Sequence, residues 1–105
     1  MDNNIEWIEN WYQQNCDGVW EHLYGVTIET LDNPGWSIKI DLSETQYENM
    51  QLDKIIWDKG DDWLTCWIKD RCFYGCGDPL KLGKIIEVFR NCVLEYDSES
   101  SGKVC

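Results

Sequence analysis

The sequence predicts one α+β domain, in which an antiparallel β-meander of about five to six strands is flanked by an N-terminal and a C-terminal helix. Apolar residues in the middle of the chain fall at every second position, which is the period of a half-buried strand. Near both ends they recur at three- and four-residue spacing, which is the period of a helix that packs by one face. The order helix, strands, helix follows from these two periods.

The first helix is predicted over Asn4–Asn15. Its apolar face is formed by residues three or four apart: Ile5, Ile8, Trp11 and Tyr12. Asn3 or Asn4 can cap the start, because a short side-chain oxygen accepts hydrogen bonds from the free N–H groups of the first turn. Asp17-Gly18 is typical of a helix end. We expect the apolar face to pack on the sheet, and a role as a partner-docking face is the alternative.

A hairpin is predicted around the DNPG segment, because apolar residues alternate on both sides of it: Val26 and Ile28 before it, and Trp36, Ile38, Ile40 and Leu42 after it. Pairing Ile28 with Ile40 keeps one shared buried face and sets Glu29 opposite Lys39. That register requires a loop with an odd number of residues. We expect Gly35 to take a positive φ in this loop.

The rest of the sheet is predicted from three further segments. The polar SETQYENMQLDK segment is expected to hold a short strand near Thr45 to Glu48, followed by an irregular link. Ile55-Ile56-Trp57, the turn-like DKGDD and WLTCWIK then indicate a second hairpin, and CFYGC indicates a last strand.

A second helix is predicted to begin with Asp78 as N-cap and Pro79 at the first helical position, where the missing N–H costs nothing. Helical spacing of apolar residues then continues to about Tyr96 through Leu82, Ile85, Ile86, Phe89 and Val93. We therefore place a single domain at residues 1–96 and a flexible polar tail at residues 97–105.

Composition bounds the function. The 43% hydrophobic content and seven Trp residues are too high for a disordered chain, and 105 residues leave no room for a second domain. The formal net charge of −11 argues against nucleic acid and anionic membranes as direct ligands, because phosphate binding needs Lys and Arg. A basic protein partner remains open, and the alternative is that the acids only keep the domain soluble.

We expect a cytoplasmic protein, since the N-terminus lacks the basic segment of a signal peptide and no run of about 18 apolar residues could span a bilayer. The six cysteines are then expected to be free thiols. They are Cys16, Cys66, Cys72, Cys76, Cys92 and Cys105.

The sequence predicts neither a cofactor nor a metal site, and no catalytic residue. His22 is the one histidine, and Cys72 and Cys76 form a single C-x3-C without a second pair of ligands. The alternative is a thiol-dependent enzyme in which Cys16, Cys72 or Cys76 acts with His22. Arg71 beside Cys72 is the one hint of a lowered thiol pKa.

A partner-binding patch is predicted on the strand WLTCWIK, because it carries apolar residues on both faces. Either helices cover both sides of the sheet, or Trp63 and Trp67 form a partly exposed aromatic patch among nearby acids. The candidate partner-binding residues are Trp63, Trp67, Asp58, Asp61, Asp62 and Asp70, with Glu21 and His22 added from the WEHLYG segment.

Several segments, taken in order, carry a resemblance to a known family: WYQQNCDG, WEHLYG, TIETLDNPGWSIKIDL, DDW, FYGCGDP and LGKIIEVF. Together they resemble the immunity 53 family of bacterial polymorphic-toxin systems from about Ile5 to Phe89. The ordered combination of CDG, WEH, YG and LDNPGWS is its most specific part. Cys66, Cys72 and Cys76 do not belong to the family pattern.

The resemblance implies a small bacterial antidote that binds a cognate toxin made beside it and protects the producing cell. It brings no catalytic residues. Many such toxins are nucleases with cationic grooves, so an acidic surface could occupy such a groove in place of phosphates. A general protein-interaction module without a toxin partner is the remaining alternative, and the sequence leaves the oligomeric state open.

Overall fold

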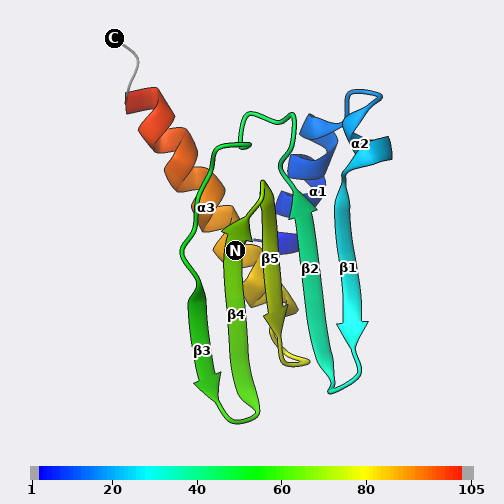
Figure 1. Ribbon diagram of the computed structural model, residues 1–105, viewed down its shortest axis with the longest axis vertical. Helices are drawn as coiled ribbons and strands as arrows, with labels where there is room; N and C mark the ends of the chain where they lie inside the picture. The colour runs from blue at the N-terminus through cyan, green and yellow to red at the C-terminus, as the bar shows by residue number, and fades with distance from the viewer. Residues whose placement is uncertain (1–2, 103–105) are drawn as a thin grey trace.

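The computed structural model describes residues 3–102, in which a five-stranded sheet lies in front of two long helices (Figure 1). The elements, in chain order, are α1 (Asn4–Asn15), α2 (Trp20–Leu23), β1 (Val26–Leu31), β2 (Gly35–Asp41), β3 (Ile55–Lys59), β4 (Asp62–Lys69), β5 (Cys72–Gly77) and α3 (Leu82–Gly102). The sheet is antiparallel throughout. The predicted α+β class, with a helix at each end of the chain, is confirmed.

The strand order differs from a simple meander. It runs β1-β2-β5-β4-β3, so the last strand lies in the middle between β2 and β4. The segment from Leu42 to Lys54 crosses one end of the sheet and carries the chain to the far edge (Figure 1). β5 takes the central place because its CFYGCG sequence has no charged side chain, and a central strand is buried on more sides than an edge strand.

The β1–β2 hairpin has the predicted faces but not the predicted register. Val26 pairs with Ile40 and Ile28 with Ile38, so the pairing is displaced by two residues from the expected one. Because side chains alternate with a period of two, this displacement keeps the apolar residues on one face. Glu29 consequently lies opposite Ser37 instead of Lys39.

The loop of this hairpin has the odd number of residues that we expected, but its conformation differs. Leu31 pairs with Gly35, which leaves Asp32, Asn33 and Pro34 as the loop, and the Asn33–Pro34 peptide is cis. Gly35 does not take a positive φ, so that prediction was wrong. It is a strand residue against Gly77, whose carbonyl oxygen would lie 2.3 Å from a Cβ at position 35.

The expected short strand near Thr45 to Glu48 is absent from the described structure, because this segment forms turns. The Thr45 hydroxyl donates to the Leu42 carbonyl at 2.8 Å, a local bond that favours a turn over a strand. Tyr47 is buried, with its ring centroid 5.9 Å from that of Trp11. The segment therefore anchors the crossing link to the helix layer.

α3 begins later and ends later than predicted. Asp78 does not cap the helix, because its carboxylate is bound by the Trp63 and Leu80 N–H groups, and the helix begins at Leu82. At the other end, α3 passes Asp97 and continues to Gly102, where a tail was expected. Asp97 accepts a hydrogen bond from the Tyr47 hydroxyl at 3.1 Å, which ties this turn to the domain. Residues 103–105 lie outside the described residues, and the domain boundary stays a prediction.

The core lies between the sheet and the two long helices. α1 has the predicted bounds, and Asn3 caps it by accepting a hydrogen bond from the Glu6 N–H at 3.1 Å. Phe89 of α3 joins the layers, since its ring centroid lies 4.9 Å from that of Trp11 and 5.0 Å from that of Phe73. Within residues 3–102 no helix is long and apolar enough to cross a membrane.

Two glycines of β5 bring α3 close to the sheet. A Cβ at Gly75 would lie 2.3 Å from Ile85 Cγ2, and one at Gly77 would lie 2.6 Å from Lys81 Cβ. Because no side chain stands between them, the helix backbone packs directly over the central strand. The opposite face of β5 then carries the larger Tyr74, which positions it for the site described next.

Candidate partner-binding site

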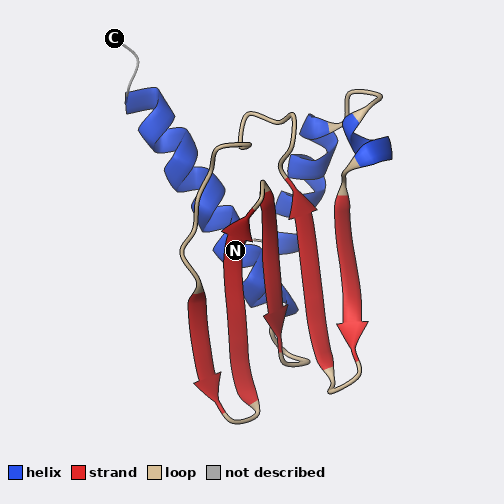
Figure 2. Cartoon of the chain, in the orientation of Figure 1, coloured by secondary structure: helices blue, strands red, loops and turns tan. Residues whose placement is uncertain are grey.

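The sheet has one face without a helix, which we call the open face. α1 and α3 both lie behind the sheet in the view of Figure 2, and α2 lies beyond one end of it. Trp63 and Trp67 of the strand WLTCWIK point to the open face and are only partly buried, so helices do not cover both sides of the sheet here. Leu64 and Cys66 point the other way, into the core.

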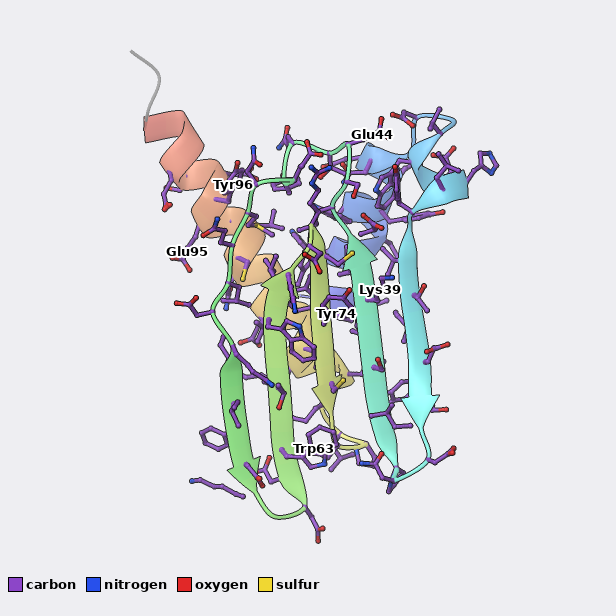
Figure 3. The ribbon with its side chains drawn as sticks, viewed as in Figure 1. Lys39, Glu44, Trp63, Tyr74, Glu95 and Tyr96 are labelled. Atoms are coloured by element: carbon purple, nitrogen blue, oxygen red, sulfur yellow. The ribbon has the colours of Figure 1, made fainter. Side chains whose placement is uncertain are left out.

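The centre of the open face is a row of aromatic and cationic side chains from neighbouring strands. Tyr74 of β5 lies opposite Trp67 of β4 and Lys39 of β2 (Figure 3). The Trp67 and Tyr74 rings are stacked, with centroids 5.3 Å apart and planes at 20°. Lys54 Nζ lies 5.2 Å from the Trp67 ring centroid, within range of a cation–π interaction. The stack therefore has a lysine on each side.

A second row beside the first is small and polar. Cross-strand pairing places Glu29, Ser37, Cys76, Thr65 and Ile56 along it. The Cys76 Sγ and Ser37 Oγ atoms are 4.0 Å apart. This row ends at Ile56 on the sheet edge, and Ile56 is 66% exposed. On the open face, this row separates the aromatic row from Trp63 and Asp58 at the end of the β3–β4 hairpin.

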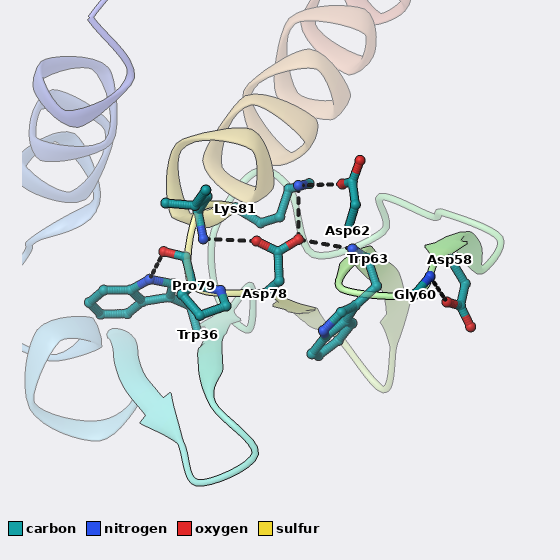
Figure 4. Close-up of polar contacts among 9 residues, drawn as sticks. Trp36, Asp58, Gly60, Asp62, Trp63, Asp78, Pro79 and Lys81 are labelled. Carbon is teal, nitrogen blue, oxygen red and sulfur yellow. Dashed lines mark hydrogen bonds and ion pairs between the residues drawn. The ribbon is translucent and has the colours of Figure 1, made fainter.

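Three candidate residues meet at the tip of the β3–β4 hairpin. Asp58 lies opposite Trp63 across the two strands, on the open face. Its carboxylate accepts a hydrogen bond from the Gly60 N–H at 3.2 Å (Figure 4). Asp61 follows in the turn as an exposed residue. The tip thus combines two carboxylates with one half-buried indole.

Asp62 belongs to a different cluster, on the helix side of β4. Lys81 Nζ binds the carboxylates of both Asp62 and Asp78, and the contact to Asp78 is 2.8 Å (Figure 4). The hydrogen bond from Lys81, together with those from the Leu80 and Trp63 N–H groups, lowers the pKa of Asp78 to about 2. Asp78 is the buried member of this group, which ties the segment before α3 to the start of β4, so Asp62 and Asp78 act in the fold.

The remaining candidates lie at the opposite end of the sheet. Asp70 is in the β4–β5 turn beside Arg71, and both residues have positive φ. Glu21 is engaged locally, since its carboxylate accepts hydrogen bonds from the Asp17 and Gly18 N–H groups at 2.9 and 2.8 Å. His22 is exposed on α2. The structure therefore separates the predicted residues into a hairpin-tip group, a central Trp67, Asp62 on the helix side of β4 and a distant group.

Cys66 and Cys72 lack the lowered pKa of a reactive thiol. Burial raises the pKa of Cys72, and it raises that of Cys66 to about 12, whereas a nucleophilic cysteine needs a lowered pKa. Arg71, the neighbour that suggested an activated Cys72, forms an ion pair with Glu48 at 3.3 Å. In the part of the chain that the structure describes, no cluster of three or more His, Cys, Asp or Glu residues could hold a metal ion.

Sequence reasoning missed Tyr74, Lys39 and Lys54 as members of the surface. Alternation within CFYGC could have placed Tyr74 on the face opposite Phe73 and Gly75. Their assembly into one row depends on β5 pairing with both β2 and β4, which the predicted meander did not contain. These pairings bring Trp67, Tyr74 and Lys39 into contact range across three strands.

The chain matches the family model described as Immunity protein 53 over residues 5–94, from the start of α1 into α3. No curated protein and no solved structure matches it. The match covers nearly all of α1, all of α2, the first part of α3 and every strand of the sheet. The chain therefore belongs to the Immunity protein 53 family, and this membership implies a protein that confers immunity to a toxin.

Proposed function

We propose that this immunity protein neutralises its cognate toxin by binding and covering the toxin's functional surface, without chemistry of its own, and that the open face makes the contact. The observation that carries this proposal is the stacked pair of Trp67 and Tyr74 on a sheet face without a covering helix. Partly exposed aromatic side chains at the centre of a surface are typical of residues that dominate binding energy.

The stack suits a binding role because its geometry is set before the partner arrives. Each ring restricts the rotation of the other. Lys54, beside the edge strand β3, adds a further restriction on Trp67 because its amine lies over the Trp67 ring. A rigid anchor loses little conformational entropy when it is buried. An interface of standard size, about 1,200–2,000 Å² in total, would extend from this centre to the hairpin tip.

The charge of the protein favours a basic toxin. With a net charge of −11, it attracts a cationic surface over a distance, which raises the association rate. Lys39 and Lys54 lie beside the stack, whereas Asp58 and Asp61 lie at the tip of the hairpin. In this proposal the acids contact a cationic surface at the rim of the toxin's functional site. The most specific version of the proposal is that this site is the substrate groove of a nuclease. Binding takes place in the bacterial cytoplasm.

The test is calorimetric titration of the purified protein with the toxin domain encoded beside its gene. Trp67→Ala and Tyr74→Ala should each weaken binding about tenfold to a thousandfold, as expected for central anchors. Leu94→Ala is the matched control, because Leu94 is an apolar residue on α3 that is 49% exposed on the helix layer. Its affinity should equal that of the parent protein.

Three results would count against this proposal in different ways. Absence of binding at micromolar concentration would refute toxin capture. Unchanged affinity in folded Trp67→Ala and Tyr74→Ala proteins would remove the open face while leaving the inhibitor role intact. Loss of toxin activity at far less than one equivalent of the protein would indicate catalysis, because a covering inhibitor acts in stoichiometric proportion.

The contribution of the acids is tested separately through rates. Asp58→Asn together with Asp61→Asn should slow association with the toxin at low salt, and the difference should shrink at about 0.5 M salt because charges are then screened. Glu95→Gln together with Glu99→Gln is the control that removes the same charge, since both are exposed acids on α3. Glu95 lies away from the open face (Figure 3). An equal effect of both changes would indicate attraction by net charge alone.

A further inference from the structure

β3 is an exposed edge of the sheet, and three of its five side chains are large and apolar. It is the outermost strand on one side in Figure 1, and none of the described elements lies beyond it. Ile55 is 39% exposed, Ile56 66% and Trp57 47%. Edge strands usually carry charges or bulges instead, because free backbone groups beside apolar side chains pair readily with other strands. This edge is therefore suited to receive a strand.

The backbone of β3 offers hydrogen bonds in a defined pattern. Lys59 and Asp62 flank the two-residue turn of the β3–β4 hairpin, so this pair exchanges hydrogen bonds and every second pair after it does the same. The backbone groups of Ile56 and Asp58 consequently point away from β4. A strand added outside β3 would bond to these residues.

The sequence of this edge is complementary to an antiparallel copy of the same segment. In an antiparallel pairing of residues 53–59 with the same segment of a second copy, centred on Ile56, that residue lies opposite itself. Ile55 then lies opposite Trp57 of the second copy, so apolar side chains meet on both faces of the junction. Because Ile56 has outward backbone groups, the symmetry axis coincides with a hydrogen-bonded pair.

The charged residues match in the same register. Lys54 lies opposite Asp58 of the second copy, and by symmetry Asp58 lies opposite its Lys54. The next pair outward joins Asp53 with Lys59 in the same way. Each cross-strand pair thus has opposite charges, although the complete chains carry the same net charge.

We propose that β3 is a self-association edge at which two copies of this chain pair antiparallel about Ile56 and form a symmetric dimer with one continuous sheet. A closed two-fold contact of this kind uses the same surface of both copies. β1, the other edge strand, lacks this complementarity, because Glu29 is its one charged residue and finds no opposite charge within a second β1. The open faces of the two copies lie on the same side of the joined sheet.

A groove beside β3 extends the contact on the helix side. It has a volume of about 610 Å³, and its lining combines apolar side chains of β3, β4, α3 and the loop before α3 with Asp62, Lys81 and Lys84. Leu80 stands at this groove and is 89% exposed. In the dimer, Trp57 of the second copy lies beside Ile55 at the groove. Dimerisation therefore buries apolar surface of the groove as well as that of β3.

The first experiment is sedimentation of the protein alone, without toxin, at about 100 µM and about 0.15 M salt, where the Debye length is near 8 Å and the repulsion between acidic copies is screened. The proposal expects a species of twice the mass of one chain. Ile56→Lys places two like charges on the symmetry axis and should yield monomers. Ile28→Lys, an equal change at a 44% exposed residue of β1, should leave the dimer unchanged.

The second experiment exchanges the charges. Lys54→Asp alone and Asp58→Lys alone each create two like-charged pairs, so each variant should dimerise about tenfold more weakly or worse. An equimolar mixture of the two variants restores opposite charges in both pairs and should give a heterodimer. Recovery of dimerisation in the mixture would show that each single variant fails because of charge pairing and not because its fold is damaged. Both chains still carry their substitutions in the mixture.

A parent protein that stays monomeric under these conditions overturns the proposal, and so does a dimer that persists in Ile56→Lys. Loss of toxin binding in Ile56→Lys, with a monomeric parent protein, would assign the edge to the toxin and would equally overturn self-association. Near-ultraviolet circular dichroism of each variant confirms that the Trp environments are intact. Because no toxin is present in the sedimentation, the result is independent of the open-face proposal.

Discussion

Trp67 and Tyr74 are stacked across β4 and β5, with their ring centroids 5.3 Å apart, on a face of the sheet without a helix. Most large aromatic residues of this chain lie instead between the sheet and the helices, where Trp11 and Phe89 have centroids 4.9 Å apart. The pair of Trp11 and Phe89 is in the core and stabilises the fold, whereas the pair of Trp67 and Tyr74 faces solvent.

Trp67→Ala should therefore cost less stability than Trp20→Ala. Trp20 is 1% exposed and its indole N–H donates to the Asp41 carbonyl at 3.1 Å, so its removal should lower the free energy of unfolding by about 3–5 kcal/mol. Trp67 is only partly buried, and its removal should cost about 1–2 kcal/mol. Urea unfolding of both variants checks this. Equal losses would mean that the open-face stack serves folding more than binding.

Asp78→Asn should destabilise the protein at neutral pH and much less in acid. The pKa of Asp78 is lowered from 3.8 to about 2 in the folded protein, so the ionised carboxylate favours the folded state. This stabilisation is complete above pH 3.8 and disappears as the pH falls through about 2. Unfolding curves of the parent and the variant should differ at pH 7 and converge near pH 2. Asp61→Asn, at the exposed hairpin tip, is the control, and its free energy of unfolding at pH 7 should equal that of the parent.

Gly75→Ala and Gly83→Ala should have opposite effects on stability. A Cβ at Gly75 would lie 2.3 Å from Ile85 Cγ2, so this substitution should force α3 outward and cost about 1–3 kcal/mol. At Gly83, in α3, a Cβ meets nothing within 4 Å, and Ala should stabilise the helix by up to about 1 kcal/mol. Thermal unfolding compares the two. Tolerance of Ala at Gly75 would contradict the close packing of α3 on β5.

The thiols should react with iodoacetamide in an order set by burial. Cys66 and Cys72 are buried with raised pKa values, so both should stay unmodified near pH 7.5 until the protein unfolds. Cys16 is partly exposed, and its Sγ lies 3.3 Å from the Tyr12 carbonyl oxygen. It should react before the other two. Peptide mass spectrometry measures each rate, and rapid alkylation of Cys72 in folded protein would revive the thiol-enzyme hypothesis.

Part of the fold followed from local patterns because local forces decide it. The bounds of α1 agree with its apolar spacing and its Asn3 cap, and the β3–β4 hairpin lies where alternating strands flank the DKGDD turn. The β1–β2 register was wrong because hydrophobic alternation is equally satisfied by any displacement of two residues. Gly35, which lies against Gly77, belongs to the strand for a tertiary reason.

The site was predicted less completely than the fold. Trp63 and Trp67 were identified because a strand with apolar residues on both faces needs a cover or a partner. Asp62 faces α3 instead, where Lys81 binds it, and Asp70 lies at the far end of the sheet. These acids were grouped because they are close in the sequence. In the structure, strand alternation puts Asp62 on the helix side of the sheet, and the length of β4 puts Asp70 at its other end.

By itself, the sequence determined the types of the elements, the family and the acidic, Trp-rich composition. Periodicity, motif order and charge are properties of the chain that do not depend on its tertiary structure. Only the tertiary structure decided that β5 enters between β2 and β4, and with it that Tyr74 stacks on Trp67 and that β3 is left as an apolar edge. The physical reason is that strand order depends on which nonlocal pairing buries the most apolar surface. That quantity is a sum over the whole core and is not encoded in any one segment.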